Sequence, residues 1–175
     1  MMDYVISIKE TIEISKEDRH ELIKLKQQYW PYNEVLQSEW FDKNIRSNDY
    51  HILIWNKSKL LAYLNMVNII VELSDMRVGM LGIGNVCVDN ENVKTGMGSV
   101  IIGIANHFIK ANKMCGILLC KDNLVKFYNK NQWVLIEPKK KKVNNNEFCH
   151  NIMVYDPYGL YFSRSMSDIY IDRDF

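Results

Sequence analysis

The sequence predicts an α+β fold, with a central mixed sheet that is mostly antiparallel and carries helices on both faces. Segments of two-residue and of helical apolar spacing follow one another in the order β, α, α, β, β, β, α, β, α, β, β. The chain has 175 residues, 47% of them hydrophobic and 25% charged, as is typical of one domain with a substantial core. Gly116–Cys120 is apolar at nearly every position, which indicates a strand covered on both faces. We therefore expect residues 1–175 to form a single domain.

In the first half of the chain, each expected boundary has a chemical reason. Ser15, with Asp18 three residues later, forms a capping box that begins the first helix. Pro31 ends that helix, because proline disfavours helical geometry in the residue before it. Asn56–Lys59 is the polar turn of an antiparallel hairpin. This half is expected to contain a strand over 4–14, helices after Ser15 and over 34–45 (with Val35, Leu36 and Trp40 buried), strands over 51–55 and 60–73, and a strand ending at Val88.

The second half begins with a helix in which Ile101, Ala105 and Phe108 recur at helical spacing. The basic run Lys139–Lys142 is expected to lie in a solvated hairpin turn. This half is therefore expected to contain helices over 98–111 and 124–130 and strands over 116–120, 133–136 and 148–155.

Charge, apolar runs and cysteines argue against several classes of function. The formal net charge of +1 gives no reason to expect a nucleic-acid partner. The longest apolar runs are far shorter than the roughly 18 residues of a membrane helix. The sequence has no C-x-x-C pair and no cluster of histidines with carboxylates, so nothing in it suggests a metal site. We therefore expect the cysteines to be buried free thiols in a reducing compartment. We expect a soluble cytoplasmic protein without a signal peptide, present as a monomer or homodimer. The four cysteines are Cys87, Cys115, Cys120 and Cys149.

The segment that carries chemistry is Val93-Lys94-Thr95-Gly96-Met97-Gly98-Ser99, here called the glycine loop. It joins the strand ending at Val88 to the following helix. Glycines at 96 and 98 let main-chain N–H groups face outward where the helix begins, and the helix dipole favours an anion there. A pyrophosphate fits such a site, although glycine pairs also occur in plain tight turns.

The order of parts around this loop resembles the GNAT family, the Gcn5-related N-acetyltransferases. That family carries a phosphate loop, Gln/Arg-x-x-Gly-x-Gly/Ala, after its fourth strand, where Val93–Gly98 stands here. After its fifth strand it carries an Asn-x-x-(Ala)-x-x-Phe-Tyr-x-x-x-Gly-Phe segment. The residues that match this segment are Asn123, Phe127, Tyr128 and Trp133, with Gln132 at the glycine.

The resemblance implies a sheet that splays between its fourth and fifth strands, acetyl-CoA as co-substrate, and no metal. The end of the fourth strand would hydrogen-bond the pantetheine arm through main-chain groups. Val93 replaces the family's Gln/Arg, and Lys94 makes up for it only in part, as a point charge. For Asn123, a helix cap is the alternative role. The implied cofactor-binding residues are Val86, Cys87, Val88, Val93, Lys94, Thr95, Gly96, Met97, Gly98, Ser99 and Asn123.

By the same resemblance, an amine attacks the thioester directly and Tyr128 protonates the departing thiolate as general acid. Simple packing is the alternative role for Tyr128. Related enzymes place a glutamate on strand four, and Gly84 stands at that position here. Asn85 can hold a water but cannot act as a base. Deprotonation through a water chain, or binding of a neutral amine, is therefore expected.

Within the GNAT superfamily the chain looks most like aminoglycoside 2'-N-acetyltransferases and nodulation acyltransferases. The expected acceptor is therefore a primary amine on a small molecule, such as an aminosugar. Aromatic rings would stack on it, and the acidic tail Ser167–Phe175 would attract it if the tail folds over the cleft. Helix packing and a solvated, partly ordered terminus are the alternatives. The expected acceptor-site residues are Trp30, Tyr32, Asn85, Asp172 and Asp174.

Three other functions stay open. The missing polar groups at Val93 and Gly84 are compatible with a non-catalytic acyl-CoA-binding regulatory domain. A protein N-acetyltransferase would use the same donor half. A protein-interaction module would use the basic run Lys139–Lys142 and the aromatic loop.

Overall fold

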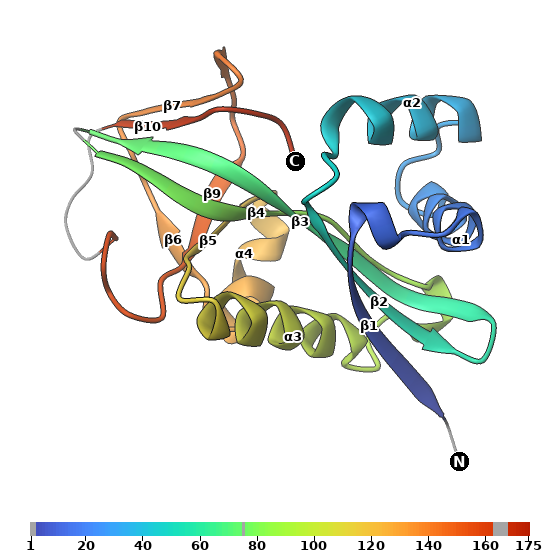
Figure 1. Cartoon of the computed structure of the whole chain (residues 1–175). Coiled ribbons are helices and arrows are strands. Elements are labelled where there is room, and N and C mark those ends of the chain that lie inside the picture. The colour runs from blue at the N-terminus through green and yellow to red at the C-terminus, as the bar shows by residue number, and fades with distance from the viewer. Residues whose placement is uncertain (1–2, 75, 163–167) are drawn as a thin grey trace. The chain divides into compact units, whose positions relative to one another are not determined.

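The computed structural model describes residues 3–74, 76–162 and 168–175, which form a mixed α+β fold (Figure 1). The chain divides into two compact units. The first unit comprises Met1–Val67, Gly84–Ala105 and Phe175, and the second comprises Asn68–Ile83 and Asn106–Asp174. Two long strands and one helix have residues in both units. The expectation of one domain over 1–175 stays a prediction. Asp75, in the expected link between two strands, and Ser167, in the expected tail, lie outside the described residues.

The first unit is built on an antiparallel ribbon of strands. Strand β1 (Tyr4–Glu10) pairs with β2 (Tyr50–Asn56), and β2 pairs with the first part of β3 (Lys59–Leu73). The polar hairpin between β2 and β3 turns through Lys57 at φ 54°, which confirms the expected turn. The other elements with residues in this unit are η1 (Thr11–Glu13), α1 (Lys16–Gln27), α2 (Glu34–Asn44), β4 (Met76–Val88), η2 (Asn90–Asn92) and α3 (Met97–Ala111).

The capping box predicted for the first helix is confirmed. The Ser15 side chain accepts a hydrogen bond from the Asp18 N–H, and the Asp18 carboxylate accepts one from the Ser15 N–H, both at 3.0 Å. The expected strand over 4–14 is too long, because its last part forms the 3-10 turn η1. The Thr11 N–H still follows the β1–β2 register and donates to the Asp49 carbonyl at 2.8 Å, whereas the Ile12 N–H leaves that register and donates to the Ser47 carbonyl at 3.3 Å.

Helix α2 lies close to its expected bounds, but the residues that it buries were predicted wrongly. Gln37 and Phe41 are buried, whereas Val35 and Leu36 are exposed. Residues four apart share one helix face, so the buried face runs through 37 and 41. Phe41 stacks on the His51 ring of β2, with the ring centroids 5.4 Å apart. Trp40, also expected to be buried, is partly exposed.

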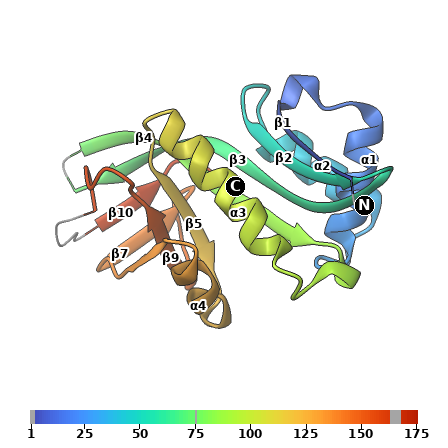
Figure 2. The same ribbon diagram turned by 90° about the horizontal axis from the view of Figure 1, so that it is seen from below.

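Helices cover both faces of the sheet in the first unit. Helices α1 and α2 lie on one side of β2 and β3, and the first part of α3 lies on the opposite side (Figures 1 and 2). The apolar side chains between these layers are fully buried. They include Leu22, Ile52, Leu53, Leu64, Met66 and Ile101.

The second unit holds a wider mixed sheet, with its strands in the order β6-β9-β5-β4-β3-β10-β7-β8. Pairing is parallel between β4 and β5 and between β10 and β7, and antiparallel in β5–β9, β6–β9, β7–β8 and β10–β3. The elements not yet bounded are β5 (Gly116–Cys120), α4 (Asp122–Lys130), β6 (Val134–Ile136), β7 (Lys140–Val143), β8 (Asn146–Glu147), β9 (Asn151–Tyr155) and β10 (Asp168–Ile171).

Two expectations for the second unit were wrong. Lys140–Lys142 of the basic run lie in strand β7 instead of a turn, and Asp168–Ile171 of the acidic tail form strand β10 instead of a solvated terminus. The two segments pair with each other in parallel, from Asp168↔Lys140 to Ile171↔Val143. Lysine is a weak strand former by itself, so this pairing depends on a distant segment of the chain. In residues 3–74, 76–162 and 168–175, no helix has both the length and the apolarity needed to cross a membrane.

Candidate functional site

The glycine loop in the first unit has the main-chain geometry of an anion site. Lys94 and Gly96 both lie in the left-handed region, at φ 68° and 93°. Helix α3 begins directly afterwards, and the N–H groups of Ser99 and Val100 donate to the Gly96 carbonyl at 2.9 and 3.1 Å. Among the described residues, the N–H groups of Gly96, Met97 and Gly98 have no hydrogen-bond partner. These free donors stand at the positive end of a 15-residue helix.

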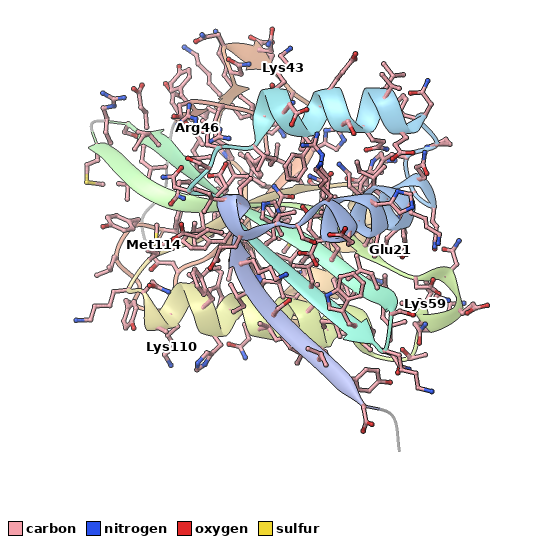
Figure 3. All side chains as sticks on the ribbon, turned by 45° about the vertical axis from the view of Figure 1, so that its right-hand side comes forward. Glu21, Lys43, Arg46, Lys59, Lys110 and Met114 are labelled. Carbon is pink, nitrogen blue, oxygen red and sulfur yellow. The ribbon has the colours of Figure 1, made fainter. Side chains whose placement is uncertain are left out.

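The side chains of the glycine loop are mostly solvent-exposed. Val93 is 45% exposed, and the Thr95 hydroxyl donates to the Asn92 carbonyl at 2.7 Å. Lys59, at the start of β3 (Figure 3), is held by Glu91 at 2.7 Å and Asp89 at 3.1 Å. Within the part of the chain that the structure describes, Lys94 forms no ion pair. An anion at the loop therefore has the positive charge of Lys94 available to it.

Strand β4 ends in an irregular segment. Its ladder with β5 has only three pairs and stops at Ile83↔Leu118, whereas β4 runs on to Val88. Asn85 adopts φ 50° inside the strand, so the regular alternation is interrupted there. The early end of the ladder agrees with the splayed sheet expected from the resemblance.

The polar groups around the end of β4 are already engaged. The Tyr29 hydroxyl donates to the Val88 carbonyl and accepts a longer hydrogen bond, of 3.4 Å, from the Val88 N–H. The Cys87 thiol faces the Tyr63 carbonyl at 3.8 Å, and burial raises the pKa of Cys87 to about 12. Val86 is half-buried. The main-chain groups of Val88, which are expected to bind pantetheine, are therefore hydrogen-bonded to the Tyr29 hydroxyl in this structure.

Two of the predicted site residues lie on helix α4 in the second unit. Asn123 is exposed in the first turn, and the helix cap is Lys121, so the cap alternative for Asn123 was wrong. Tyr128 is buried, with its ring edge-on to Phe127 at 5.0 Å and to Trp133 at 6.4 Å. Burial raises the pKa of Tyr128, so its hydroxyl stays protonated. No described residue hydrogen-bonds that hydroxyl.

The segment after Tyr128 is held by its backbone geometry and by side-chain hydrogen bonds of Asn106, Asn131 and Trp133. Gln132, at the family's glycine position, has φ 72°, a conformation that glycine adopts without strain. The next residue, Trp133, is buried and donates through Nε1 to Asn106 Oδ1 at 2.8 Å. Its ring also fills the space beside Gly116, where an added Cβ would lie 2.7 Å from the ring.

The residues expected to bind the acceptor are spread over both units. In the first unit, Trp30 and Tyr32 are 36% and 60% exposed, next to the break between α1 and α2. In the second unit, Asp172 accepts a hydrogen bond from the Ile70 N–H at 2.9 Å, and Asp174 accepts one from Asn144 at 3.2 Å. Both carboxylates are thus bound to neighbouring strands or loops. Asn85 donates to Asn65 Oδ1 at 2.8 Å.

Sequence reasoning missed three residues beside the end of β4 in the first unit. Asn65 is a fully buried polar residue between apolar neighbours in β3, a signal that was visible in the sequence. Lys26 is almost fully buried with its ammonium 4.3 Å from the Trp40 ring centroid, and burial lowers its pKa to about 8. Phe175 lies with its main chain against Gly84. No local pattern in the sequence indicates that contact, because the two residues are far apart in the chain.

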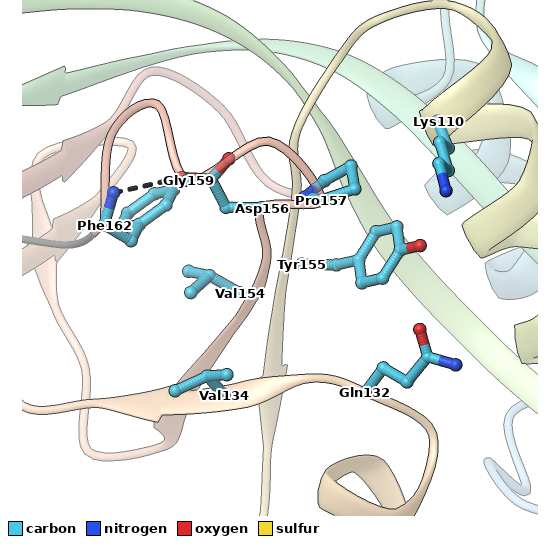
Figure 4. Close-up of a pocket in the computed structure, with 9 residues that line it drawn as sticks. All are labelled: Lys110, Gln132, Val134, Val154, Tyr155, Asp156, Pro157, Gly159 and Phe162. Carbon is cyan, nitrogen blue, oxygen red and sulfur yellow. Dashed lines mark hydrogen bonds between the residues drawn. The ribbon is translucent and has the colours of Figure 1, made fainter.

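A separate pocket of about 380 Å³ lies in the second unit (Figure 4). Its walls include Lys110, Gln132 and Tyr155. The Asp156 carboxylate at its edge is committed to its own loop, since it accepts main-chain N–H groups from residues 160 to 162. None of the predicted site residues lines this pocket.

Comparisons with solved structures find the same fold in several N-acyltransferases. An acyl-CoA N-acyltransferase from Pseudomonas aeruginosa matches 87% of this chain and 99% of its own, with a TM-score of 0.65 and 17% identity. The GNAT family N-acetyltransferase YhbS from Escherichia coli, in complex with CoA, matches 97% of this chain and 90% of its own, with a TM-score of 0.71 and 9% identity. An aminoglycoside 6'-N-acetyltransferase complexed with coenzyme A matches 85% of this chain and 96% of its own, with a TM-score of 0.64 and 10% identity.

No model of a known protein family and no curated protein sequence matches the chain. At identities below a fifth, the structural matches establish the fold and not the activity. The chain thus has the fold of the GNAT acyl-CoA N-acyltransferases.

Proposed function

We propose that this protein is an N-acetyltransferase that moves the acetyl group of acetyl-CoA to a primary amine. The observation that carries this proposal is the glycine loop, where three unpartnered N–H groups meet the start of α3. Such a site suits a pyrophosphate, and two proteins of the same fold are described in complex with CoA. Lys94 adds a positive charge without an ion-pair partner among the described residues.

The proposed reaction is a direct transfer in which the protein mainly positions the reactants. The amine lone pair attacks the thioester carbonyl carbon, the new C–N bond forms, and the C–S bond breaks. The departing thiolate takes a proton from the Tyr128 hydroxyl, and the amine loses one proton to water or a base. Support for Tyr128 comes from its place in the resembling motif and from its protonated phenol, which burial maintains.

For the acceptor, we propose a small molecule carrying a primary amine, such as an aminosugar. This finer proposal rests on the resemblance to aminoglycoside 2'-N-acetyltransferases and on the exposed rings of Trp30 and Tyr32, which suit a sugar face. Four unpaired cysteines, three of them buried, suit a reducing compartment such as the cytoplasm. A non-catalytic acyl-CoA-binding domain and a protein N-acetyltransferase are the alternatives.

The proposal is tested first at the glycine loop. At Gly96, φ is 93° and an added Cβ would have open space, so alanine there strains the backbone without a clash. We expect Gly96→Ala to weaken acetyl-CoA binding about tenfold or more in calorimetry, since a reoriented loop loses several N–H contacts. Gly103→Ala is the matched control, because it also has open space but an ordinary helical backbone.

The same calorimetry separates the alternatives when it is followed by thiol-release assays on aminoglycosides, polyamines, amino acids and peptides. Thiol release with small amines supports the proposed acceptor, and release with peptides alone favours a protein acceptor. Acetyl-CoA binding without thiol release from any amine favours the regulatory domain. The absence of any binding at millimolar acetyl-CoA overturns the donor half of the proposal.

A further inference from the structure

The pocket of the second unit is not used by any of the predicted functions. Its volume of about 380 Å³ lies in the range of protein pockets that hold small molecules. The pocket is built from the end of α3, the start of β6, the end of β9 and the loop that follows β9. All of its lining residues belong to the second unit, so this unit forms the whole pocket.

One side of the pocket is apolar. Val134 and Val154 are cross-strand partners in β6 and β9, so their side chains share one face. Phe162 lies on the same side (Figure 4). Val134 is 60% exposed, and contact with an apolar group would remove that surface from water. The loop that carries Phe162 is held without a ligand, because the Phe162 N–H donates to the Asp156 carboxylate at 3.2 Å.

The other side of the pocket is polar. The polar ends of Lys110, Gln132 and Tyr155 gather there, opposite the valine side chains (Figure 4). Lys110 forms no ion pair with any described residue. The Tyr155 hydroxyl and the Gln132 amide form no hydrogen bond within the described part of the chain. All three groups are therefore available to a ligand.

Tyr155 is the observation that points most directly to a ligand. The residue is only 7% exposed, and its ring packs on Trp133 with the two centroids 5.8 Å apart. Its hydroxyl is the part that stays accessible, at the pocket. A donor that is already held in place by packing loses little entropy when it binds a ligand.

The polar side suits a ligand with a single negative charge. An ammonium, a phenol and an amide N–H can all donate to an anion, and such hydrogen bonds are the stronger ones. Lys110 is the one cation among the lining residues, and Asp156 adds a negative charge. The Asp156 carboxylate is turned to its own side, where it accepts from the Cys115 thiol at 3.2 Å and from main-chain N–H groups of its loop. A carboxylate therefore fits better than a phosphate, which carries nearly two charges.

We propose that this pocket binds a small monocarboxylate with an apolar body. The carboxylate accepts hydrogen bonds from Lys110, the Tyr155 hydroxyl and the Gln132 amide. The apolar body covers Val134 and lies against Phe162. This site is separate from the proposed acetyl transfer and does not rest on it, since none of the residues predicted to bind the donor or the acceptor lines the pocket.

The test uses 3-phenylpropionate and 3-phenylpropanol, which share an apolar body and differ in charge, and acetate, which lacks that body. Binding of each probe to the protein is measured by saturation-transfer NMR titration. We expect 3-phenylpropionate to bind about tenfold more tightly than the alcohol, because only the acid pairs with Lys110. Acetate is expected to bind at least tenfold more weakly than 3-phenylpropionate, because it leaves the apolar side uncovered.

Lys110→Gln is expected to abolish the preference for the acid over the alcohol. Lys130→Gln is the matched control, because both lysines are exposed and lie in the last turn of a helix, and Lys130 does not line the pocket. Tyr155→Phe keeps the ring on Trp133 and is expected to weaken 3-phenylpropionate about fivefold, the value of one hydrogen bond.

Acetyl-CoA is then added to the protein with 3-phenylpropionate bound. Retention of the probe supports a separate site, whereas its displacement would assign the pocket to the donor and overturn the inference. Equal binding of the acid and the alcohol, no binding of either at millimolar concentration, or equal losses in Lys110→Gln and Lys130→Gln also overturns it. Probe binding by a protein that does not bind acetyl-CoA would contradict the proposed function and leave the carboxylate site standing.

Discussion

At the scale of single residues, the hydroxyl of Tyr29 stands where the resemblance expects a cofactor contact. It bonds both the N–H and the carbonyl of Val88, the main-chain groups expected to meet pantetheine. Tyr29 is 41% exposed, so its ring has room to leave. A side chain that must be displaced lowers the apparent affinity of the ligand that displaces it.

Removing this hydroxyl is therefore expected to strengthen acetyl-CoA binding. Tyr29→Phe keeps the ring and frees both groups of Val88, and a hydrogen bond has a net value of about 0.5–1.5 kcal/mol. We expect the Kd for acetyl-CoA to fall about two- to tenfold in calorimetry. Tyr32→Phe is the control, since Tyr32 is 60% exposed. An unchanged or higher Kd for Tyr29→Phe would mean that pantetheine does not use Val88.

Tyr128 gives the second prediction at this scale. Tyr128→Phe keeps the contacts with Phe127 and Trp133 and removes only the proton donor. General acid catalysis contributes typically 10²–10⁴-fold, so we expect kcat to fall about a hundredfold while the KM for acetyl-CoA changes little. Steady-state thiol release over a range of pH values is the measurement. Unchanged turnover at every pH would show that Tyr128 is not the general acid and only packs against its neighbours.

At the scale of elements, the short strand β5 depends on the absence of a side chain at its first residue. Gly116 faces Trp133, and an added Cβ would lie 2.7 Å from that ring and 2.8 Å from the Ile109 side chain. Trp133 is held by its hydrogen bond to Asn106, so it has little freedom to yield. The glycine thus sets how closely the tryptophan packs on β5.

Gly116→Ala is expected to lower the free energy of unfolding by about 1–3 kcal/mol, the usual cost of overpacking a core. The measurement is denaturant unfolding, in which the denaturant concentration at the midpoint should fall while the dependence of the free energy on denaturant concentration stays the same. Gly103→Ala, in open space on α3, is expected to raise the same free energy by up to about 1 kcal/mol. Equal midpoints for the two variants would contradict the proposed role of Gly116.

Some of these elements could be predicted from the sequence and others could not. Strand β5, the capping box at Ser15 and the turn at Lys57 follow from local chemistry, and all three agree with the structure. Strands β7 and β10 were missed because each is stabilised by pairing with a segment more than 20 residues away. The positive φ of Gln132 has no local signal either, since glutamine does not favour that conformation.

At the scale of the whole molecule, one buried histidine links folding to pH. His51 is fully buried between Phe41 and Tyr63. Its ring nitrogens meet the Thr11 hydroxyl at 2.9 Å and the Tyr63 hydroxyl at 2.8 Å. Burial lowers its pKa from 6.5 to about 4. Between these values the unfolded chain binds a proton that the folded chain does not.

The free energy of unfolding therefore rises with pH between about 4 and 6.5. The contribution of the neutral His51 to it is fully present above pH 6.5. A shift of this size corresponds to about 3 kcal/mol of unfolding free energy lost between pH 6.5 and 4. His51→Gln is expected to flatten this part of the profile, measured by denaturant titration at several pH values. His107→Gln, at an exposed site, is the control. A slope in His51→Gln equal to that of the unaltered protein would show that other groups cause it.

The candidate site also shows where sequence reasoning stops at this scale. The glycine loop could be predicted because glycine itself marks the backbone that φ 93° requires at position 96. The cluster of Asn65, Gly84 and Phe175 could not, because it joins residues from three distant parts of the chain. Its trace in the sequence is Asn65, a polar residue between apolar neighbours in β3.

Strand β1 bears on how the protein behaves in concentrated solution. It pairs with β2, and it exposes apolar side chains at consecutive positions and thus on both of its faces: Tyr4, Val5 and Ile6 are 45%, 58% and 50% exposed. A formal net charge of +1 provides little mutual repulsion between molecules. Exposed apolar edge strands promote association. Sample preparation at high protein concentration is thus best served by a charged residue in place of Val5 or Ile6, far in the sequence from the glycine loop and from Gly84.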